Sequence, residues 1–156
     1  MNVNGTKEFD ASREIVWSVI DDPVQMAGLM PGVESLDIKD ERHWQAKVKV
    51  PLGIGGLKMT IDFEKVEERP LEFASMNAKG KGVGAMMNMT TSFTLTGEGE
   101  QTSMAWTADV KMAGPVGSMG QRVLQPIVQQ QVGNVLTALE VKVAEAKAAA
   151  AGAGGA

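Results

Sequence analysis

Few residues in this 156-residue sequence have side chains that commonly perform catalysis. His43 is the single histidine and cysteine is absent, which excludes thiolate nucleophiles, disulfides and soft transition-metal sites. Two pairs of adjacent carboxylates, Asp21-Asp22 and Glu67-Glu68, would suit general acid–base chemistry. Their contexts indicate a helix end and a turn, and His43 falls on the polar face of its predicted strand. We therefore expect a protein that is not an enzyme, with no catalytic and no metal-binding residue.

Glycine-rich stretches and net charge exclude two further classes of site. Residues 53–56 and 80–84 are rich in glycine, but neither stretch follows a strand and opens a helix, as phosphate-binding loops do. Ser118 lacks the G-x-S-x-G context of a nucleophile elbow. The net charge of -4 lacks the basic character that nucleic-acid binding requires.

Methionine is the more informative residue type. The sequence has 11 methionines and no tyrosine, and only 4% of its residues are aromatic. Methionine fills irregular cores and also adapts to apolar guests, so each one alone is explained equally well by core filling. Together they gather on predicted inward faces, on a short helix and in a glycine-rich junction, which predicts an apolar cavity for a hydrophobic ligand. We expect the cavity to be lined by Met26, Met30, Met59, Met87, Met89, Trp106, Met112, Gly117, Met119 and Leu124.

The elements that must position these residues follow from hydrophobic periodicity. A strand is predicted over residues 3–9, followed by a helix capped at Asp10 or Ser12 and a short helix over 24–30. Alternation then predicts antiparallel strands over residues 33–39, 43–50, 57–64, 71–79, 87–95 and 104–112. A helical period returns from residue 121 to about 149. We expect a domain over residues 1–147 and a flexible Ala/Gly tail over 148–156.

This order of elements predicts an α+β fold of the helix-grip type. A curved antiparallel sheet of about seven strands must wrap around the long C-terminal helix, with the two short helices after strand 1 at its rim. The junction over residues 113–122 lies at the mouth of the space between sheet and helix. Its glycines would form a gate, with Met119 as the apolar face of that gate. A tight strand-to-helix turn is the alternative.

Two stretches resemble a known family. Residues 9–37, FDASREIVWSVIDDPVQMAGLMPGVESLD, and residues 108–128, ADVKMAGPVGSMGQRVLQPIV, resemble the CoxG family of carbon monoxide dehydrogenase subunits. That family belongs to the START/Bet v 1-like (SRPBCC) superfamily. The resemblance covers residues 1–146, and its most specific parts are the DDP…LMPGVES pattern and the run from Gly114 to Arg122.

The resemblance implies a non-catalytic accessory protein of a molybdenum carbon monoxide dehydrogenase or a related molybdenum hydroxylase. It would couple the enzyme to the respiratory chain at the cytoplasmic membrane surface, with a bound quinone (menaquinone or ubiquinone) or lipid and no covalent cofactor. We expect a cytoplasmic protein, peripheral to the inner face of the membrane. Many members carry a membrane-associating segment after the domain, so docking uses either such a segment or the cavity rim.

Two other functions stay open. The first is an adaptor or scaffold that recruits the dehydrogenase to the membrane without a ligand. The second is a small enzyme of the aromatase/cyclase kind, which the superfamily also contains.

Overall fold

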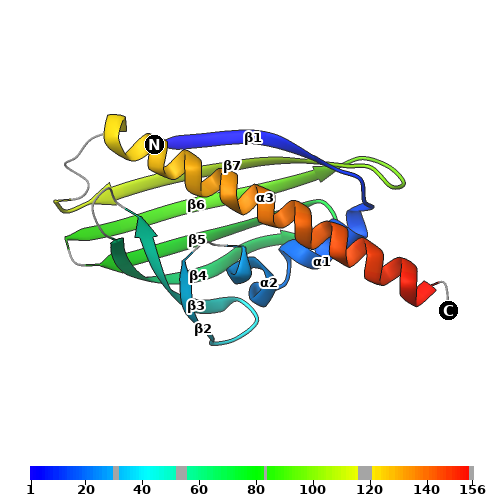
Figure 1. Cartoon of the computed structure of the whole chain (residues 1–156), viewed down its shortest axis with the longest axis horizontal. Coiled ribbons are helices and arrows are strands. Elements are labelled where there is room, and N and C mark those ends of the chain that lie inside the picture. Colours follow the sequence, from blue (N-terminus) through cyan, green and yellow to red (C-terminus); the bar gives the residue numbers. More distant parts are fainter. Residues whose placement is uncertain (30–31, 52–55, 83, 116–120, 155–156) are drawn as a thin grey trace.

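The computed structural model describes residues 1–29, 32–51, 56–82, 84–115 and 121–154. One sheet lies against one long helix, with two short helices at one end of the sheet (Figure 1). In chain order the elements are β1 (Asn2–Phe9), α1 (Arg13–Ile20), α2 (Pro23–Gly28), β2 (Val33–Ile38), β3 (His43–Pro51), β4 (Gly56–Arg69), β5 (Phe73–Gly82), β6 (Ala85–Thr96), β7 (Thr102–Ala113) and α3 (Gln121–Gly154). The predicted α+β helix-grip fold is confirmed.

The sheet is open and antiparallel, with seven strands in the order β1-β7-β6-β5-β4-β3-β2. β1 and β2 are therefore its two edges, and the first strand of the chain pairs with the last. From β2 to β7, each strand pairs with the strand that follows it in the chain, which keeps sequence neighbours adjacent in space. α3 crosses one face of this sheet, and no helix formed by the described residues covers the other face (Figure 1).

Side chains along the strands alternate between buried and exposed, as the sequence pattern predicts. On β3, Trp44, Ala46 and Val48 are buried while His43, Lys47 and Lys49 are exposed. Trp44 stacks on its cross-strand partner Phe63, with ring centroids 5.6 Å apart. Aromatic cross-strand pairs of this kind stabilise a sheet beyond the area that they bury. The inward face of the sheet is therefore apolar, and the outward face is polar.

Side-chain caps fix the two short helices. Ser12 precedes α1, and its hydroxyl accepts a hydrogen bond from the Ile15 amide at 3.4 Å. Asp22 precedes α2, and its carboxylate accepts from the Val24 amide at 2.9 Å, with Pro23 opening the helix. Both arrangements satisfy amides that a helix leaves without partners at its start.

Two details differ from the sequence predictions. β4 continues to Arg69, so Glu67 and Glu68 lie within a strand and not in a turn. α3 continues to Gly154, so residues 148–154, predicted to be a flexible tail, are helical. The alanine-rich composition of these residues explains the helix, because alanine has the highest helix propensity and outweighs the glycines among them.

Candidate ligand-binding site

The two halves of α3 meet the rest of the protein differently. In the second half, Leu139 and Val143 are buried in a cluster that includes residues of α1. In the first half Leu124 is buried, whereas the other apolar residues of the stripe are only half-buried, namely Ile127, Val128, Val132, Val135 and Leu136. The first half of α3 therefore lies over the sheet without fully covering it.

The apolar interior is divided into two clusters. One joins α1, α3 and the ends of β6 and β7, and includes Val16, Met104 and Leu139. The other joins β3, β4 and β5 around Trp44 and Phe63. Met26 and Phe93 are half-buried and pack against both clusters. They therefore connect the two clusters on the inner side of the sheet.

The predicted lining residues have three different environments. Met59 and Leu124 are buried, at 4% and 6% exposure, so they belong to the packed interior. The residues that are half-buried on the inward side are Met26, Met87, Met89, Trp106 and Met112. Met30, Gly117 and Met119 lie outside the described residues.

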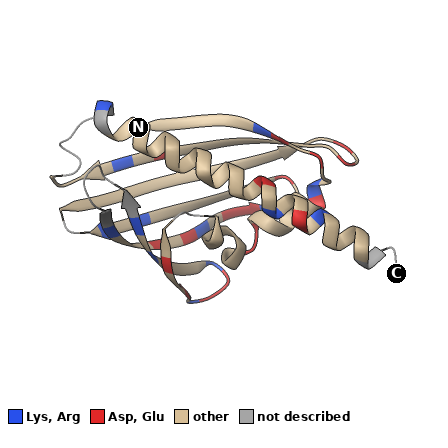
Figure 2. Cartoon of the chain, viewed as in Figure 1, with Lys and Arg blue, Asp and Glu red and all other residues tan. Residues whose placement is uncertain are grey.

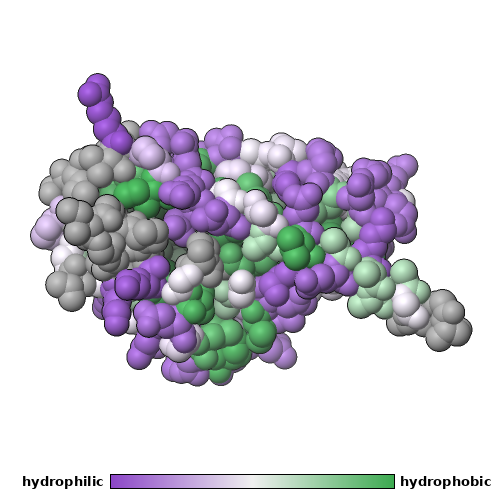
Figure 3. All heavy atoms as spheres, in the orientation of Figure 1, coloured by the Kyte–Doolittle hydropathy of each residue, from purple (hydrophilic) through white to green (hydrophobic). Residues whose placement is uncertain are grey.

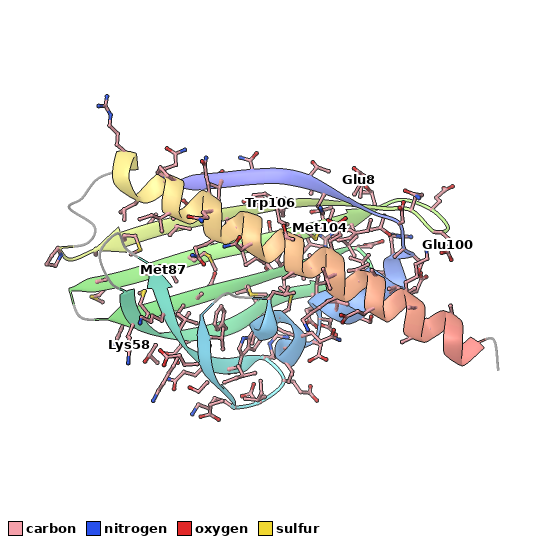
Figure 4. All side chains as sticks on the ribbon, in the orientation of Figure 1. Glu8, Lys58, Met87, Glu100, Met104 and Trp106 are labelled. Carbon is pink, nitrogen blue, oxygen red and sulfur yellow. The ribbon has the colours of Figure 1, made fainter. Side chains whose placement is uncertain are left out.

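Met87, Met89, Trp106 and Met112 lie on the face of the sheet that α3 crosses, whereas Met26 lies on α2. Met87 lies toward the end of the sheet where β6 begins and β7 ends, and Met104 lies further along the sheet (Figure 4). Met87 and Met89 both pack against the β3–β5 cluster. Hydrophobic patches on this side of the molecule are visible between hydrophilic borders (Figure 3). The inner face thus presents flexible apolar side chains that are only partly covered.

A hollow of about 380 Å³ lies between the edge strand β1 and α3. Its α3 wall is one helical stripe at positions i, i+3, i+4 and i+7, made of Gln129, Val132, Gly133 and Leu136. Its other wall is made of Asn2, Val3, Asn4 and Trp106. None of these lining residues carries a charge, so the hollow suits a neutral ligand group. We refer to it as the β1–α3 hollow.

A smaller hollow, of about 200 Å³, lies on β2, β3 and β4. Its lining differs in kind because it includes charged side chains. The residues are Glu34, Lys47, Val48, Lys58, Met59 and Thr60. Met59, predicted to line the ligand cavity, therefore touches this second hollow and not the β1–α3 hollow.

Trp106 carries an unsatisfied polar group at the β1–α3 hollow. Its indole Nε1 is buried, and in the described part of the chain it is the one buried side-chain nitrogen or oxygen without a hydrogen-bond partner. Its cross-strand partner on β1 is Gly5. A Cβ at Gly5 would lie 2.9 Å from Trp106 Cζ2, so the indole rests directly on the backbone of β1.

Sequence reasoning found Trp106 but missed the β1–α3 hollow. Gly5 within a strand and Gly133 within a helix were the available signals, because glycine inside a regular element marks a close approach or an open space. At Gly133, no atom lies within 4 Å of the position that a Cβ would take. The predicted gate stays a prediction, although Gly114 does adopt a φ of 83°.

Charge is distributed unevenly over the outward face of the sheet. Six exposed lysines occupy the strand ends near the β3–β4, β5–β6 and β7–α3 connections, whereas most carboxylates lie elsewhere (Figure 2). We call this group the lysine end; it consists of Lys47, Lys49, Lys58, Lys79, Lys81 and Lys111. Lys49 and Lys58 are direct cross-strand partners. Like charges in that position are destabilising, so the sheet is not arranged there for stability alone.

The carboxylate pairs considered as catalytic candidates have structural surroundings. Lys65 Nζ lies 3.0 Å from Asp21 Oδ1 and 2.8 Å from Glu68 Oε1, which ties the end of α1 to β4. Burial and a hydrogen bond with Glu68 raise the pKa of Asp21 above its usual value. Burial acts in the same direction on Glu68, but hydrogen bonds from Lys65 and Asp21 outweigh it and lower the pKa of Glu68. None of the three lines either hollow.

His43 is exposed on the outward face, as predicted. Its Nδ1 lies 2.9 Å from Asp40 Oδ1, and its Nε2 lies 3.3 Å from Glu64 Oε2. Hydrogen bonding to Asp40, with a smaller effect of Glu64, raises the pKa of His43. In the described ranges no three His, Asp or Glu side chains are arranged to hold a metal ion. No helix in those ranges is long and apolar enough to span a membrane.

Solved structures share this fold. A conserved protein from Geobacillus kaustophilus has 23% sequence identity and a TM-score of 0.86, covering 93% of this chain and 96% of that one. The Zhui aromatase/cyclase from a Streptomyces species has 17% identity and a TM-score of 0.68, covering 94% and 93%. A START superfamily protein from Mycobacterium smegmatis has 16% identity and a TM-score of 0.67, covering 92% and 97%. The fold is therefore START-like.

Sequence comparison assigns the family. No curated protein shows significant similarity to the chain. The model of the CoxG family matches residues 5–144, which include both stretches that carry the resemblance and the α3 wall of the β1–α3 hollow. The chain belongs to the CoxG family of carbon monoxide dehydrogenase subunits.

Proposed function

We propose that this protein is a non-catalytic accessory of a molybdenum carbon monoxide dehydrogenase or a related hydroxylase. It binds an apolar molecule, a quinone or a lipid, between the sheet and α3. It thereby helps the enzyme to exchange electrons with the membrane respiratory chain. The observation that carries this proposal is the incomplete cover over Met87, Met89 and Trp106 on the inner face of the sheet.

A physical argument connects that incomplete cover to the family. Exposing apolar surface to water costs about 0.8 kcal/mol per CH₂ group, so an isoprenoid quinone does not leave a membrane unaided. A half-covered apolar face removes most of that cost by replacing lipid contacts with protein contacts. Methionine suits this task because its flexible side chain adapts to a guest and closes up without one.

The lysine end supports docking on an anionic membrane surface. In the described part of the chain, none of its six lysines forms an ion pair. Each lysine near an anionic bilayer contributes about 1 kcal/mol of attraction, so a cluster outweighs the repulsion from a net charge of -4 elsewhere. Met86, 52% exposed, lies among these lysines as the cross-strand partner of Lys81.

The residues that line the β1–α3 hollow are not ionisable, which favours a carrier over an enzyme. The residues around the β1–α3 hollow are amide or apolar side chains and one glycine, which neither donate nor accept protons at neutral pH. The aromatase/cyclase neighbour shares the fold at 17% identity, and fold alone does not assign its activity to this chain. Turnover of polyketide-like substrates would be the sign of that alternative.

Native mass spectrometry of the protein purified from its own host tests the proposal. We expect a bound species whose mass matches a quinone or lipid and which is lost after organic extraction. Recovery of ligand-free protein that also takes up no quinone or lipid on addition would contradict the carrier role. The adaptor function without a ligand would then be the better account.

A further inference from the structure

An unpaired indole N–H is an unusual feature for a small protein. Buried polar groups almost always have a hydrogen-bond partner, because leaving one without a partner is costly. Trp106 Nε1 breaks this rule, and it does so in a residue that lines the β1–α3 hollow. Such an exception calls for a partner that the protein itself does not supply.

The N–H edge of the Trp106 ring packs closely against the backbone of β1. On β6 its cross-strand partner is Phe93, whereas on β1 it is Gly5. The position that a Cβ would take at Gly5 is 3.3 Å from Nε1. The indole therefore occupies the space that a side chain at residue 5 would need, and glycine is the residue type that permits this close contact.

The opposite wall of the hollow includes a glycine, Gly133. Gly133 faces open space, and it is flanked on the α3 stripe by Gln129 and Leu136. On the strand side, Asn4 Nδ2 donates a hydrogen bond to Asn2 Oδ1 at 3.1 Å, so that amide oxygen already has a donor. The hollow is thus uncharged, with amide and apolar side chains around it, and among the described residues Trp106 Nε1 is its one buried donor without an acceptor.

We propose that the β1–α3 hollow receives an uncharged oxygen acceptor of the apolar ligand, such as a carbonyl, and that Trp106 Nε1 donates a hydrogen bond to it. This inference rests on the proposed function, because it assigns a contact within the same site. It selects oxygen-bearing apolar ligands over hydrocarbons. Removing a donor that a ligand needs lowers affinity, whereas apolar contacts elsewhere in the site are unaffected.

Access to the N–H requires a small movement. Nε1 is covered in the structure, while other atoms of Trp106 line the hollow. The half-buried first half of α3, or a turn of the indole over Gly5, provides this movement. The unpaired N–H raises the free energy of the closed, empty form, so a ligand that supplies an acceptor gains affinity on entry.

The test compares two probes on the full chain. Menadione is a naphthoquinone with two carbonyls, and methylnaphthalene has the same ring system without oxygen; because the chain has no cysteine, the quinone has no thiol to react with. Trp106 is replaced by benzothienylalanine, a two-ring isostere in which sulfur replaces the N–H. Trp17→Phe serves as the control, because Trp17 is half-buried on α1 and lines neither hollow.

We expect the isostere to weaken menadione binding about tenfold, with methylnaphthalene binding unchanged and Trp17→Phe unchanged for both. In wild-type protein, the Trp106 indole proton resonance should move downfield with menadione and not with methylnaphthalene. This second readout is made on the wild-type protein, and Trp106→Phe assigns the resonance by its disappearance.

Three outcomes would overturn the inference. If the isostere weakens both probes equally, or neither, Trp106 contributes packing and no hydrogen bond. If the indole proton responds equally to both probes, the donor role is likewise wrong while ligand binding stands. If wild-type protein binds neither probe, the inference and the proposed function fail together.

Discussion

Lys7 of β1 and Glu140 of α3 form an ion pair, with Nζ 2.7 Å from Oε2, that links the edge strand directly to the long helix. Lys7 is two residues beyond Gly5, and Glu140 is one helical turn beyond Leu136. The ion pair therefore connects β1 to α3 immediately next to the hollow. It limits how far the two walls can separate.

Removing this pair should affect ligand exchange more than stability. Glu140 is 61% exposed, so we expect Glu140→Gln to lower the free energy of unfolding by less than about 1 kcal/mol. Ligand dissociation, measured by stopped-flow transfer to acceptor vesicles, should be several times faster. The control is Glu100→Gln, which removes the exposed Lys147–Glu100 pair away from the hollow. If ligand dissociation became equally faster in both variants, the Lys7–Glu140 pair would have no specific effect on the hollow.

Two glycines at the hollow should respond to alanine in opposite directions. At Gly5, a methyl group would lie 2.9 Å from the indole of Trp106, so Gly5→Ala should destabilise the protein by about 1 kcal/mol or more. At Gly133 nothing lies within 4 Å, so Gly133→Ala should stabilise it by about 0.5–1 kcal/mol through helix propensity. Urea unfolding of both variants measures the two signs. Stabilisation by Gly5→Ala would show that Trp106 does not rest on β1.

The cluster around Lys65 predicts a pH-dependent loss of stability. In Lys65→Met the pKa values of Asp21 and Glu68 should both rise above their unfolded values, because burial and mutual repulsion then act without the cation. A raised folded-state pKa gives stability that is present below the unfolded pKa, near 4, and is lost as the pH rises through the folded pKa. The variant should therefore lose about 1–2 kcal/mol near pH 7 and much less near pH 4.

Chemical denaturation at the two pH values checks this sign. Lys58→Met is the matched control, because Lys58 is an exposed lysine of the same strand and takes part in no ion pair among the described residues. It should change stability little at either pH. If Lys65→Met lost more unfolding free energy at pH 4 than at pH 7, the Lys65 cation would not be what stabilises the two carboxylates.

The lysine end should bind anionic vesicles in a salt-dependent way. We expect Lys79→Gln combined with Lys81→Gln to reduce co-flotation with phosphatidylglycerol vesicles at least tenfold, since each lysine contributes about 1 kcal/mol. Lys39→Gln combined with Lys147→Gln removes the same charge from positions outside the lysine end and should have little effect. Binding that is equal for neutral and anionic vesicles, or lost equally in both double variants, would contradict docking by this surface.

Most of the fold follows from the sequence because period-two alternation is unambiguous on two-faced strands. His43 to Lys49 alternate in burial as their residue types predict. The sequence pattern does not predict how completely each inward side chain is buried. Met59 and Met87 have the same residue type and the same inward parity, yet one is buried and the other half-buried. Met59 belongs to the buried cluster around Trp44 and Phe63, whereas Met87 packs against that cluster from outside, and no local pattern encodes this difference.

The β1–α3 hollow was missed for a related reason. Its walls come from the first strand and the last helix, and their alignment depends on the pairing of β1 with β7. Neither Asn4 nor Gln129 looks like a site residue by type. At the end of α3, composition alone does not decide between two predictions. The alanine-rich residues suggest a low-complexity tail, but alanine also favours a helix, and a helix is what forms.

Binding of an apolar guest on the inner face of the sheet is reported most directly by the methionine methyl groups. Met86 and Met87 are adjacent in sequence but face opposite sides, with Met86 52% exposed on the outward face. In methyl-labelled protein titrated with menadione, we predict shifts of the Met87 and Met89 methyl resonances and none for Met86. Equal shifts for Met86 and Met87, or no shift at all, would contradict binding at this face.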